Sequence, residues 1–356
     1  LNTSNIPTPT IKDGSKYFQA ALYTGSTSAQ DITFGGNSDL APDWLWFKAR
    51  SGASNHFLFD KVRGVNKGIL SDATTVETTY TNSLTAFGTD GFSLGDGGSS
   101  NDINGVDGTT YVAWGWAAGG TSGSTNEDGS VDSTVTANTT AGFSICKLNP
   151  GGNSNITFGH GLGTAPRLVI VKDLEDVTNW QVLHLDQGVG NKLFLNSTAA
   201  AASDANMWQN TAPTSTVVSM GTAQTTNEQF IAYCFAEVEG YSKFSSYIGN
   251  GNVDGPYGYT GFKPAFIIFK NISASSQDWE MFDNKRDGFN DANRRLYPNT
   301  NDVEPSASNR VRLTSNGFKI VTSGGTHVNG SGNTIIYMAF AEHPFGGDGV
   351  APVTAR

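Results

Sequence analysis

The chain repeats one pattern three times. Each copy contains a proline, then an apolar run, then a lysine six positions after the proline: Pro42–Lys48, Pro166–Lys172 and Pro264–Lys270. Each copy closes on a second apolar run that ends in alanine, over residues 111–117, 230–236 and 335–341. Proline and closing alanine are about 75 residues apart in each copy, a spacing that points to tandem modules. A chain that repeats one module is more typical of an extended or assembled structural protein than of an enzyme.

The composition predicts that each module is built from β-strands. The chain has 356 residues, so each copy has about 100 residues and is large enough to bury its own core. Charged residues make up only 15% and glycine contributes 43 residues, which is typical of strands joined by many turns. Residues that favour helices are too scattered to sustain a helical period. We therefore predict an all-β chain of three tandem antiparallel β-sandwich modules, jelly-roll-like in character.

The module boundaries follow from the repeats and from changes in composition. The predicted segments are an N-terminal arm with the first module, a linker rich in glycine, serine and threonine, a second module, a third module and a C-terminal tail: 1–117, 118–140, 141–240, 241–345 and 346–356. The short join between the second and third modules predicts a fixed angle there, whereas the linker predicts a looser one.

Strands are predicted from short apolar runs bounded by glycine, asparagine, aspartate and serine. The runs 168–171 and 266–269 are continuously apolar, so they should be central strands covered on both faces. In the first module the strand candidates are 17–23, 31–34, 44–48, 56–59, 91–94 and 111–117.

Charge and hydropathy limit the partners of this chain. The formal net charge of -10 repels phosphate backbones, so we expect no nucleic-acid partner. No apolar run approaches the roughly 20 residues that span a bilayer, so we expect no membrane insertion. The first ten residues lack a basic region followed by an apolar stretch, so no signal peptide is expected. Cys146 and Cys234 lie in apolar runs and are predicted to be buried free thiols.

A recurrent segment with an aromatic residue and a polar residue four positions later is the strongest candidate site. Its copies are His56–Asp60, Trp180–His184 and Trp279–Asp283. Trp180 and Trp279 could stack on a sugar ring while His184 and Asp283 accept from its hydroxyls. The alternative, which we prefer, places the tryptophans in the core and the polar residues at strand ends.

Other candidates for chemistry are weaker. The lysines that end the central strands are predicted to reach solvent, with a phosphate or carboxylate contact as the alternative. Acidic residues followed by glycine, such as Asp90-Gly91 and Asp96-Gly97, are interpreted as turns rather than calcium loops. No histidine pair has zinc-site spacing and no serine lies in a nucleophile elbow. We therefore expect no metal, no cofactor and no enzymatic activity.

Several segments resemble a repeat family common in marine tailed phages. They are 17–25, 90–94, 110–116, 235–266 and 336–345, and the resemblance extends from about Pro9 to Phe345. The family is mostly described as virion or tail-fibre-like proteins, and it has no catalytic residues to transfer. The resemblance implies a structural protein of the phage virion.

Three functions fit this expectation. The first is an exterior appendage, such as a tail fibre, spike or head fibre, that presents its modules for attachment to the host surface. The second is a capsid decoration or cement protein, and the third is a carbohydrate-binding adhesin module. In each case the expected location is the exterior of the particle. The expected partners are other virion proteins, further copies of the chain and, for the first and third, a host surface glycan.

Overall fold

The structure is a computed structural model that describes residues 9–97, 103–221, 227–287, 289–305, 310–323 and 325–344. The predicted tail at 346–356 and the first eight residues of the predicted arm lie outside these ranges. Within them, no helix combines the length and the apolar character needed to cross a membrane.

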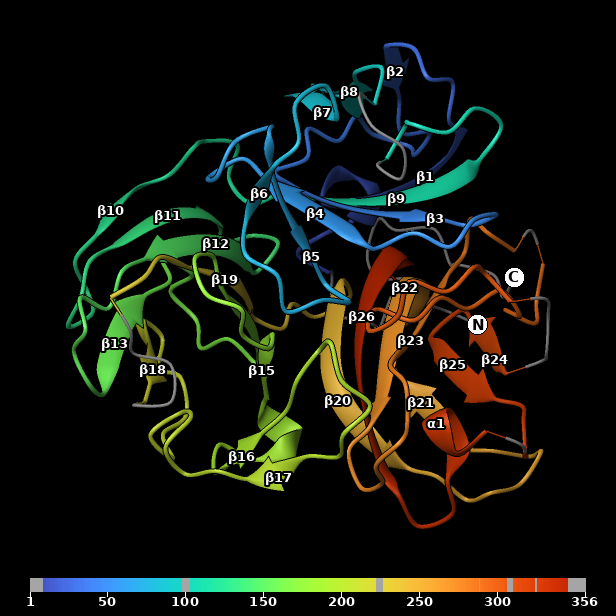
Figure 1. The fold of residues 1–356 in the computed structure, drawn as a ribbon. Coiled ribbons are helices and arrows are strands. Elements are labelled where there is room, and N and C mark those ends of the chain that lie inside the picture. The colour runs from blue at the N-terminus through green and yellow to red at the C-terminus, as the bar shows by residue number, and fades with distance from the viewer. Residues whose placement is uncertain are drawn as a thin grey trace.

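Each repeat contains one large antiparallel sheet, and four strands of that sheet follow the same order in all three (Figure 1). In the first repeat they are β1 (Phe18–Thr24), β9 (Thr110–Trp116), β3 (Trp44–Ala49) and β4 (Phe57–Asp60). In the second they are β12 (Phe143–Leu148), β19 (Phe230–Phe235), β14 (Leu168–Asp173) and β15 (Gln181–His184). In the third they are β20 (Ser242–Ile248), β26 (Thr334–Pro344), β22 (Phe262–Asn271) and β23 (Glu280–Asp283).

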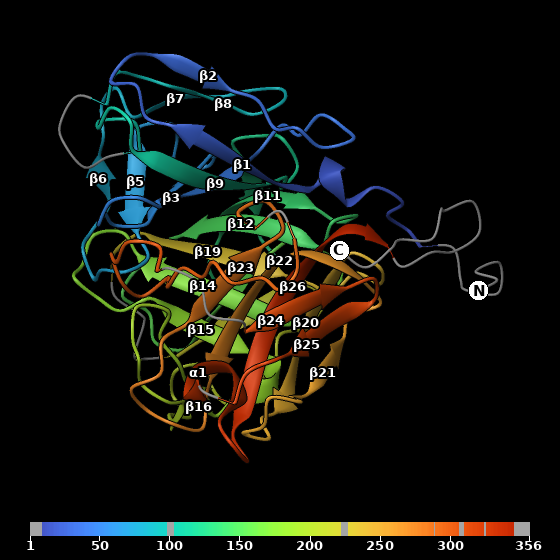
Figure 2. The same cartoon turned by 90° about the vertical axis from the view of Figure 1, so that its right-hand side faces the viewer.

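A smaller antiparallel sheet covers the outer face of each large sheet, as Figures 1 and 2 show. The three small sheets consist of β2 (Gln30–Ile32), β8 (Phe92–Leu94) and β7 (Leu84–Phe87); β13 (Ile156–Gly159) and β18 (Val217–Met220); and β21 (Tyr257–Tyr259), β25 (Gly317–Ile320) and β24 (Val311–Thr314). The all-β prediction, with an antiparallel sandwich in each repeat, is confirmed.

Short additional elements complete the described chain. They are β5 (Lys67–Leu70), β6 (Thr78–Thr79), β10 (Ser124–Asn126), β11 (Ser133–Asn138), β16 (Asn191–Lys192), β17 (Ala202–Ser203), the 3-10 turns η2 (Gly14–Lys16) and η3 (Leu185–Gln187), and the single helix turn α1 (Thr326–Asn329). Strands β10 and β11 fall in the segment 118–140, which the sequence predicted to be a linker. They pair with each other and then with β12, so this segment extends the second large sheet.

The central strands are buried on both faces because each face packs on a different core. In β3, Leu45 and Phe47 pack beneath the small sheet of their own repeat, whereas Trp44 and Trp46 face the other two repeats. Every residue of β3 and of β14 is buried. The prediction of central strands covered on both faces is therefore correct, and its cause is the contact between repeats.

The inner faces of the three large sheets meet in one shared aromatic core. Trp116, Phe235 and Phe340 occupy equivalent positions, because each pairs with the matching residue of its central strand. The ring centroids of Trp116 and Phe340 are 5.7 Å apart, as are those of Phe235 and Phe340. Trp44 also stacks on Tyr233 of the second repeat at 4.5 Å. The three repeats therefore surround one pseudo-three-fold axis and form a single body.

Candidate functional site

The two tryptophans of the candidate site are buried and join neighbouring repeats. The indole nitrogen of Trp180 donates to the carbonyl oxygen of Leu70 at 2.7 Å, and that of Trp279 donates to the carbonyl of Phe194 at 3.0 Å. Leu70 and Phe194 hold equivalent places in their repeats, opposite the residue that follows the aromatic position. The tryptophans are 0% and 5% exposed, so neither offers a ring face on which a sugar could stack.

His56 takes the same position in the first repeat. It is buried, and its Nδ1 accepts a hydrogen bond from the indole of Trp46 at 2.9 Å. The backbone of Tyr297, in the third repeat, faces the ring, although Nε2 has no hydrogen bond within the described residues. Burial holds the pKa of His56 well below its ordinary value, so the ring is neutral.

The polar residue that ends each candidate segment joins its repeat to another one. The hydroxyl of Tyr233 donates to Asp60 Oδ2 at 2.8 Å, and the indole of Trp114 donates to Asp283 Oδ2 at 3.0 Å. His184 Nε2 lies 3.2 Å from the carbonyl oxygen of Tyr337. We call these three contacts the inter-repeat locks.

The inter-repeat locks form a closed ring. The first repeat is locked to the second through Asp60, the second to the third through His184, and the third to the first through Asp283. The three polar residues come from the ends of equivalent strands, β4, β15 and β23. Repetition in the sequence thus reflects a repeated contact between modules, and each predicted site residue makes its own contact with a neighbouring repeat.

Two of the locks contain a buried arginine three residues after the aspartate. Arg63 Nε lies 2.5 Å from Asp60 Oδ2, and Arg286 Nε lies 2.5 Å from Asp283 Oδ2, with all four side chains fully buried. Burial alone would raise the pKa of Asp283, but the guanidinium of Arg286 holds it below its ordinary value. The carboxylate therefore stays ionised and paired, which suits a structural contact better than proton transfer.

A repeated motif marks this pair in the sequence, although none of the predictions above rests on it. Asp-x-x-Arg occurs at 60–63 and again at 283–286, at matching points of two repeats. The partner residues Tyr233 and Trp114 lack such a signal, since each lies more than 160 positions away along the chain.

His184 replaces the aspartate in the second repeat and forms its contact without charge. The amide of Asp186 donates to His184 Nδ1 at 3.2 Å, so Nε2 carries the proton that points to the carbonyl of Tyr337. Burial lowers the pKa of His184 to about 4. The lock of the second repeat therefore depends on a neutral imidazole.

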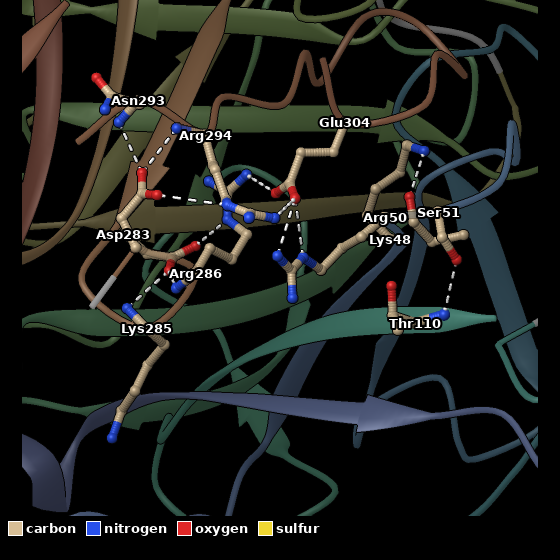
Figure 3. A network of polar contacts seen from close by, with 12 residues as sticks. Lys48, Arg50, Ser51, Thr110, Asp283, Lys285, Arg286, Asn293, Arg294 and Glu304 are labelled. Atoms are coloured by element: carbon tan, nitrogen blue, oxygen red, sulfur yellow. Dashed lines mark hydrogen bonds and ion pairs between the residues drawn. The ribbon is translucent and has the colours of Figure 1, made fainter. Parts of the chain in front are cut away.

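A carboxylate with three arginine partners extends the contact between the first and third repeats (Figure 3). Glu304 lies 2.9 Å from Arg50 of the first repeat, 2.9 Å from Arg286 and 3.3 Å from Arg294. Burial alone would raise the pKa of Glu304, but the arginines hold it below the ordinary value. This network ties the loop that carries Glu304 to Arg50, the residue that follows strand β3 of the first repeat.

The lysines that end the central strands are buried, contrary to our prediction that they reach solvent. Lys48, Lys172 and Lys270 are at most 1% exposed, and burial lowers the pKa of each to about 8. The ammonium of Lys48 donates to the carbonyl of Ala49 at 2.8 Å, and that of Lys172 to the carbonyl of Asp173 at 2.6 Å. The prediction was wrong because each ammonium finds backbone carbonyls inside the molecule that accept from it, so it does not need to reach water.

Among the described residues, one group of carboxylates lies close enough to hold a cation. Oxygen atoms of Asp173, Asp176 and Glu228 lie within 4.8 Å of one another. The ammonium of Lys172 already donates to the carbonyls of Asp173 and Asp176, at 2.6 and 3.2 Å. A positive charge of the chain itself therefore lies beside this group.

Exposed aromatic surface is found on the small sheet of the third repeat. Tyr257 and Tyr259 of β21 are 45% and 62% exposed, whereas Gly258 between them faces inward. A Cβ on Gly258 would come within 2.1 Å of the ring of Phe318, so only glycine fits between the tyrosines. The hydroxyl of Tyr257 contacts Asn316 and, at 3.2 Å, Thr314, which holds the ring against the sheet. We call Tyr257 and Tyr259 the tyrosine face.

The comparisons with known proteins place the chain in a family. The family model described as a domain of unknown function (DUF7483) matches residues 13–344, so the chain belongs to this family. No curated protein and no solved structure matches the chain.

Proposed function

We propose that this member of the family is a structural protein of a phage virion, located on an exterior appendage and used for attachment to the host surface. The arrangement of the predicted site residues is the observation that carries the proposal. Each of them is used inside the molecule to join one repeat to another. Such a use of polar and aromatic side chains supports a rigid structural body rather than a catalyst.

The closed ring of inter-repeat locks supports a rigid virion protein that keeps its shape outside a cell. Each repeat is held on two sides by inter-repeat locks, and in two of the locks a buried arginine of the same repeat keeps the aspartate ionised and in place. A rigid body loses little conformational entropy on binding, so weak contacts with a surface are used efficiently. Several copies on one particle would then multiply a weak individual affinity.

The tyrosine face supports contact with a host surface. All seven tryptophans are buried, and the exposed aromatic side chains in the described part of the third repeat are Tyr257 and Tyr259, which share strand β21, and Phe289 in a loop. Tyrosine offers an apolar ring with a polar end, which suits contact with sugars and with proteins alike. A rigid sheet displays these rings at a fixed separation.

Labelled electron microscopy of the source particle tests the location. An antibody raised against residues 141–345 should label tail-associated or other projecting appendages. Label spread over the head would favour the capsid decoration protein, and absence of label from every particle would refute the virion assignment.

A competition assay tests attachment. The purified chain, added in excess to host cells, should slow adsorption of the phage. The variant Tyr259→Ala should compete less well if the tyrosine face makes the contact. Val177→Ala is the matched control, because Val177 is a 71% exposed apolar side chain in the second repeat. Equal competition by both variants would remove the tyrosine face from the proposal, and no competition by the wild-type chain would refute the attachment role.

A further inference from the structure

We propose that a polar pocket in the second repeat binds one ring of a neutral saccharide. The pocket has a volume of about 330 Å³. It is lined by residues of β10, β11 and β12, their flanking loops and the residue before β19: Thr125, Asp132, Ser133, Thr134, Lys147, Leu148, Asn149 and Gln229. The volume falls at the lower end of the range for small-molecule sites, which suits one sugar ring better than a large cofactor.

The pocket exists because the second repeat has a hairpin that the other large sheets lack. Strands β10 and β11 continue the sheet beyond β12, whereas the equivalent strands β1 and β20 are the edges of their sheets in the described chain. Four lining residues come from this hairpin: Thr125, Asp132, Ser133 and Thr134. The shared three-repeat framework is complete without the hairpin, so the hairpin is available for a specific task.

Several polar side chains of the pocket are not engaged by the protein. Across the described residues, no hydrogen bond or ion pair occupies the ammonium of Lys147, the carboxylate of Asp132 or the side-chain amide of Gln229. The same holds for the hydroxyls of Thr125 and Thr134. By contrast, the ammonium of the buried Lys172 donates to a backbone carbonyl. The pocket therefore offers unused donors and acceptors at its wall.

These unused groups match the hydroxyls of a sugar. A hydroxyl both donates and accepts, so neighbouring hydroxyls can donate to Asp132 while accepting from Lys147 and Gln229. Hydrogen bonds with a charged partner are stronger than those between neutral groups. Leu148 adds an apolar contact for the carbon atoms of the ring.

Charge favours a neutral sugar over an acidic one. The pocket contains one positive and one negative side chain, Lys147 and Asp132, which balance. Further carboxylates flank it in the sequence, at Glu127, Asp128 and Glu228, and the whole chain carries a net charge of -10. An anionic sugar would have to overcome this field.

Sugar binding by the pocket would contribute to the proposed host attachment, and its biological role rests on that proposal. The binding itself can be measured separately. The test uses the full chain and a panel of methyl glycosides of glucose, galactose, mannose and N-acetylglucosamine, with glucuronate as the acidic counterpart. Saturation-transfer NMR detects binding and titration gives the dissociation constant. At least one neutral glycoside should bind, and glucuronate should bind more weakly than glucose.

Two variants locate the site. Lys147→Met and Asp132→Asn should each weaken binding at least tenfold, since each removes a charged hydrogen-bond partner. Asp132 is exposed and Lys147 is half-buried without a partner, so both variants should fold. Lys16→Met is the control, because Lys16 is an exposed lysine of the first repeat that is far from the hairpin in sequence. Thermal unfolding followed by circular dichroism confirms that the variants are intact.

Four results would overturn the inference, and the first three concern the pocket and the panel alone. They are unchanged binding in both pocket variants, tighter binding of glucuronate than of the neutral sugars, and no binding of any panel member. None of these decides the proposed function, because antibody labelling and competition by the wild-type chain are read without assuming which surface of the chain binds. Loss of binding in Tyr259→Ala with no loss in the pocket variants would also overturn it and would move the sugar to the tyrosine face.

Discussion

Replacing Tyr233 by phenylalanine should weaken the lock between the first and second repeats without disturbing the packing. The side chain is fully buried, and its hydroxyl donates to Asp60 Oδ2 at 2.8 Å. The ring, which stacks on Trp44 at 4.5 Å, stays in place, so no cavity opens. The loss is therefore the hydrogen bond donated to a charged group, which contributes about 1.5–3 kcal/mol to the free energy of unfolding, together with the longer bond of 3.4 Å that the hydroxyl accepts from Arg63 Nη2.

Arg63 keeps the loss from being larger. Its Nε remains on Asp60 Oδ2 at 2.5 Å and its Nη2 donates to the carbonyl of Leu58 at 3.1 Å, so neither charge is left alone. Urea unfolding followed by tryptophan fluorescence and circular dichroism measures the change. All seven tryptophans are buried and they are distributed over the three repeats, so fluorescence reports on the whole body. The midpoint should fall while the slope stays constant.

A double-mutant cycle with Asp60→Asn shows whether the effect belongs to the lock. We expect a coupling energy of about 1–2 kcal/mol between the two positions, because they share a hydrogen bond. A loss below about 0.5 kcal/mol in Tyr233→Phe, or additive effects in the double variant, would refute the view that this contact holds the repeats together. Separate transitions for the two probes in the wild-type chain would refute the single shared body.

Three further predictions concern buried titratable groups. His184 has a pKa of about 4 in the fold against 6.5 in the unfolded chain, so only the unfolded chain gains its proton between these values. Stability should therefore fall by about 3 kcal/mol as pH drops from 6.5 to 4, and urea midpoints over this range should fall less in His184→Gln. Acylation at pH 8, followed by mass spectrometry, should modify exposed Lys16 but spare the three buried strand-end lysines; equal labelling would contradict their burial. Cys146 and Cys234 are free and buried, so a thiol reagent should react only after denaturant is added, and rapid reaction in buffer would disprove this.

The framework of the fold could be predicted from the sequence because it depends on local patterns. Continuous apolar runs such as 168–171 became central strands, and all six strand candidates of the first repeat overlap strands of the structure. The short strands β5, β6 and β7 were missed, and β6 could not have been found because Thr78–Thr79 contains no apolar residue. Strand β10, with the polar sequence Ser-Thr-Asn, was missed for the same reason.

The contacts between repeats could not be predicted because their partners are far apart in the chain. Trp180 looks the same in sequence whether its indole meets a sugar or the carbonyl of Leu70, and only the fold brings that carbonyl to it. The lysines were misjudged for a related reason. A lysine at a strand end usually extends to water, but at Lys270 the carbonyls of Ser197 and Gln277 lie close enough to accept from it.

The closed ring has a consequence for how the chain reaches its final shape during synthesis. The indole of Trp114 binds Asp283, which is made 169 residues later. Until the third repeat leaves the ribosome, the inner faces of the first two repeats lack the aromatic wall that Phe266 and Phe340 provide. Contacts between residues so far apart in the chain form late, and they make folding slow. Until they form, the incomplete chain exposes an aromatic surface that is prone to aggregation. A chain truncated before the third repeat should therefore aggregate, although two-thirds of its residues are already present.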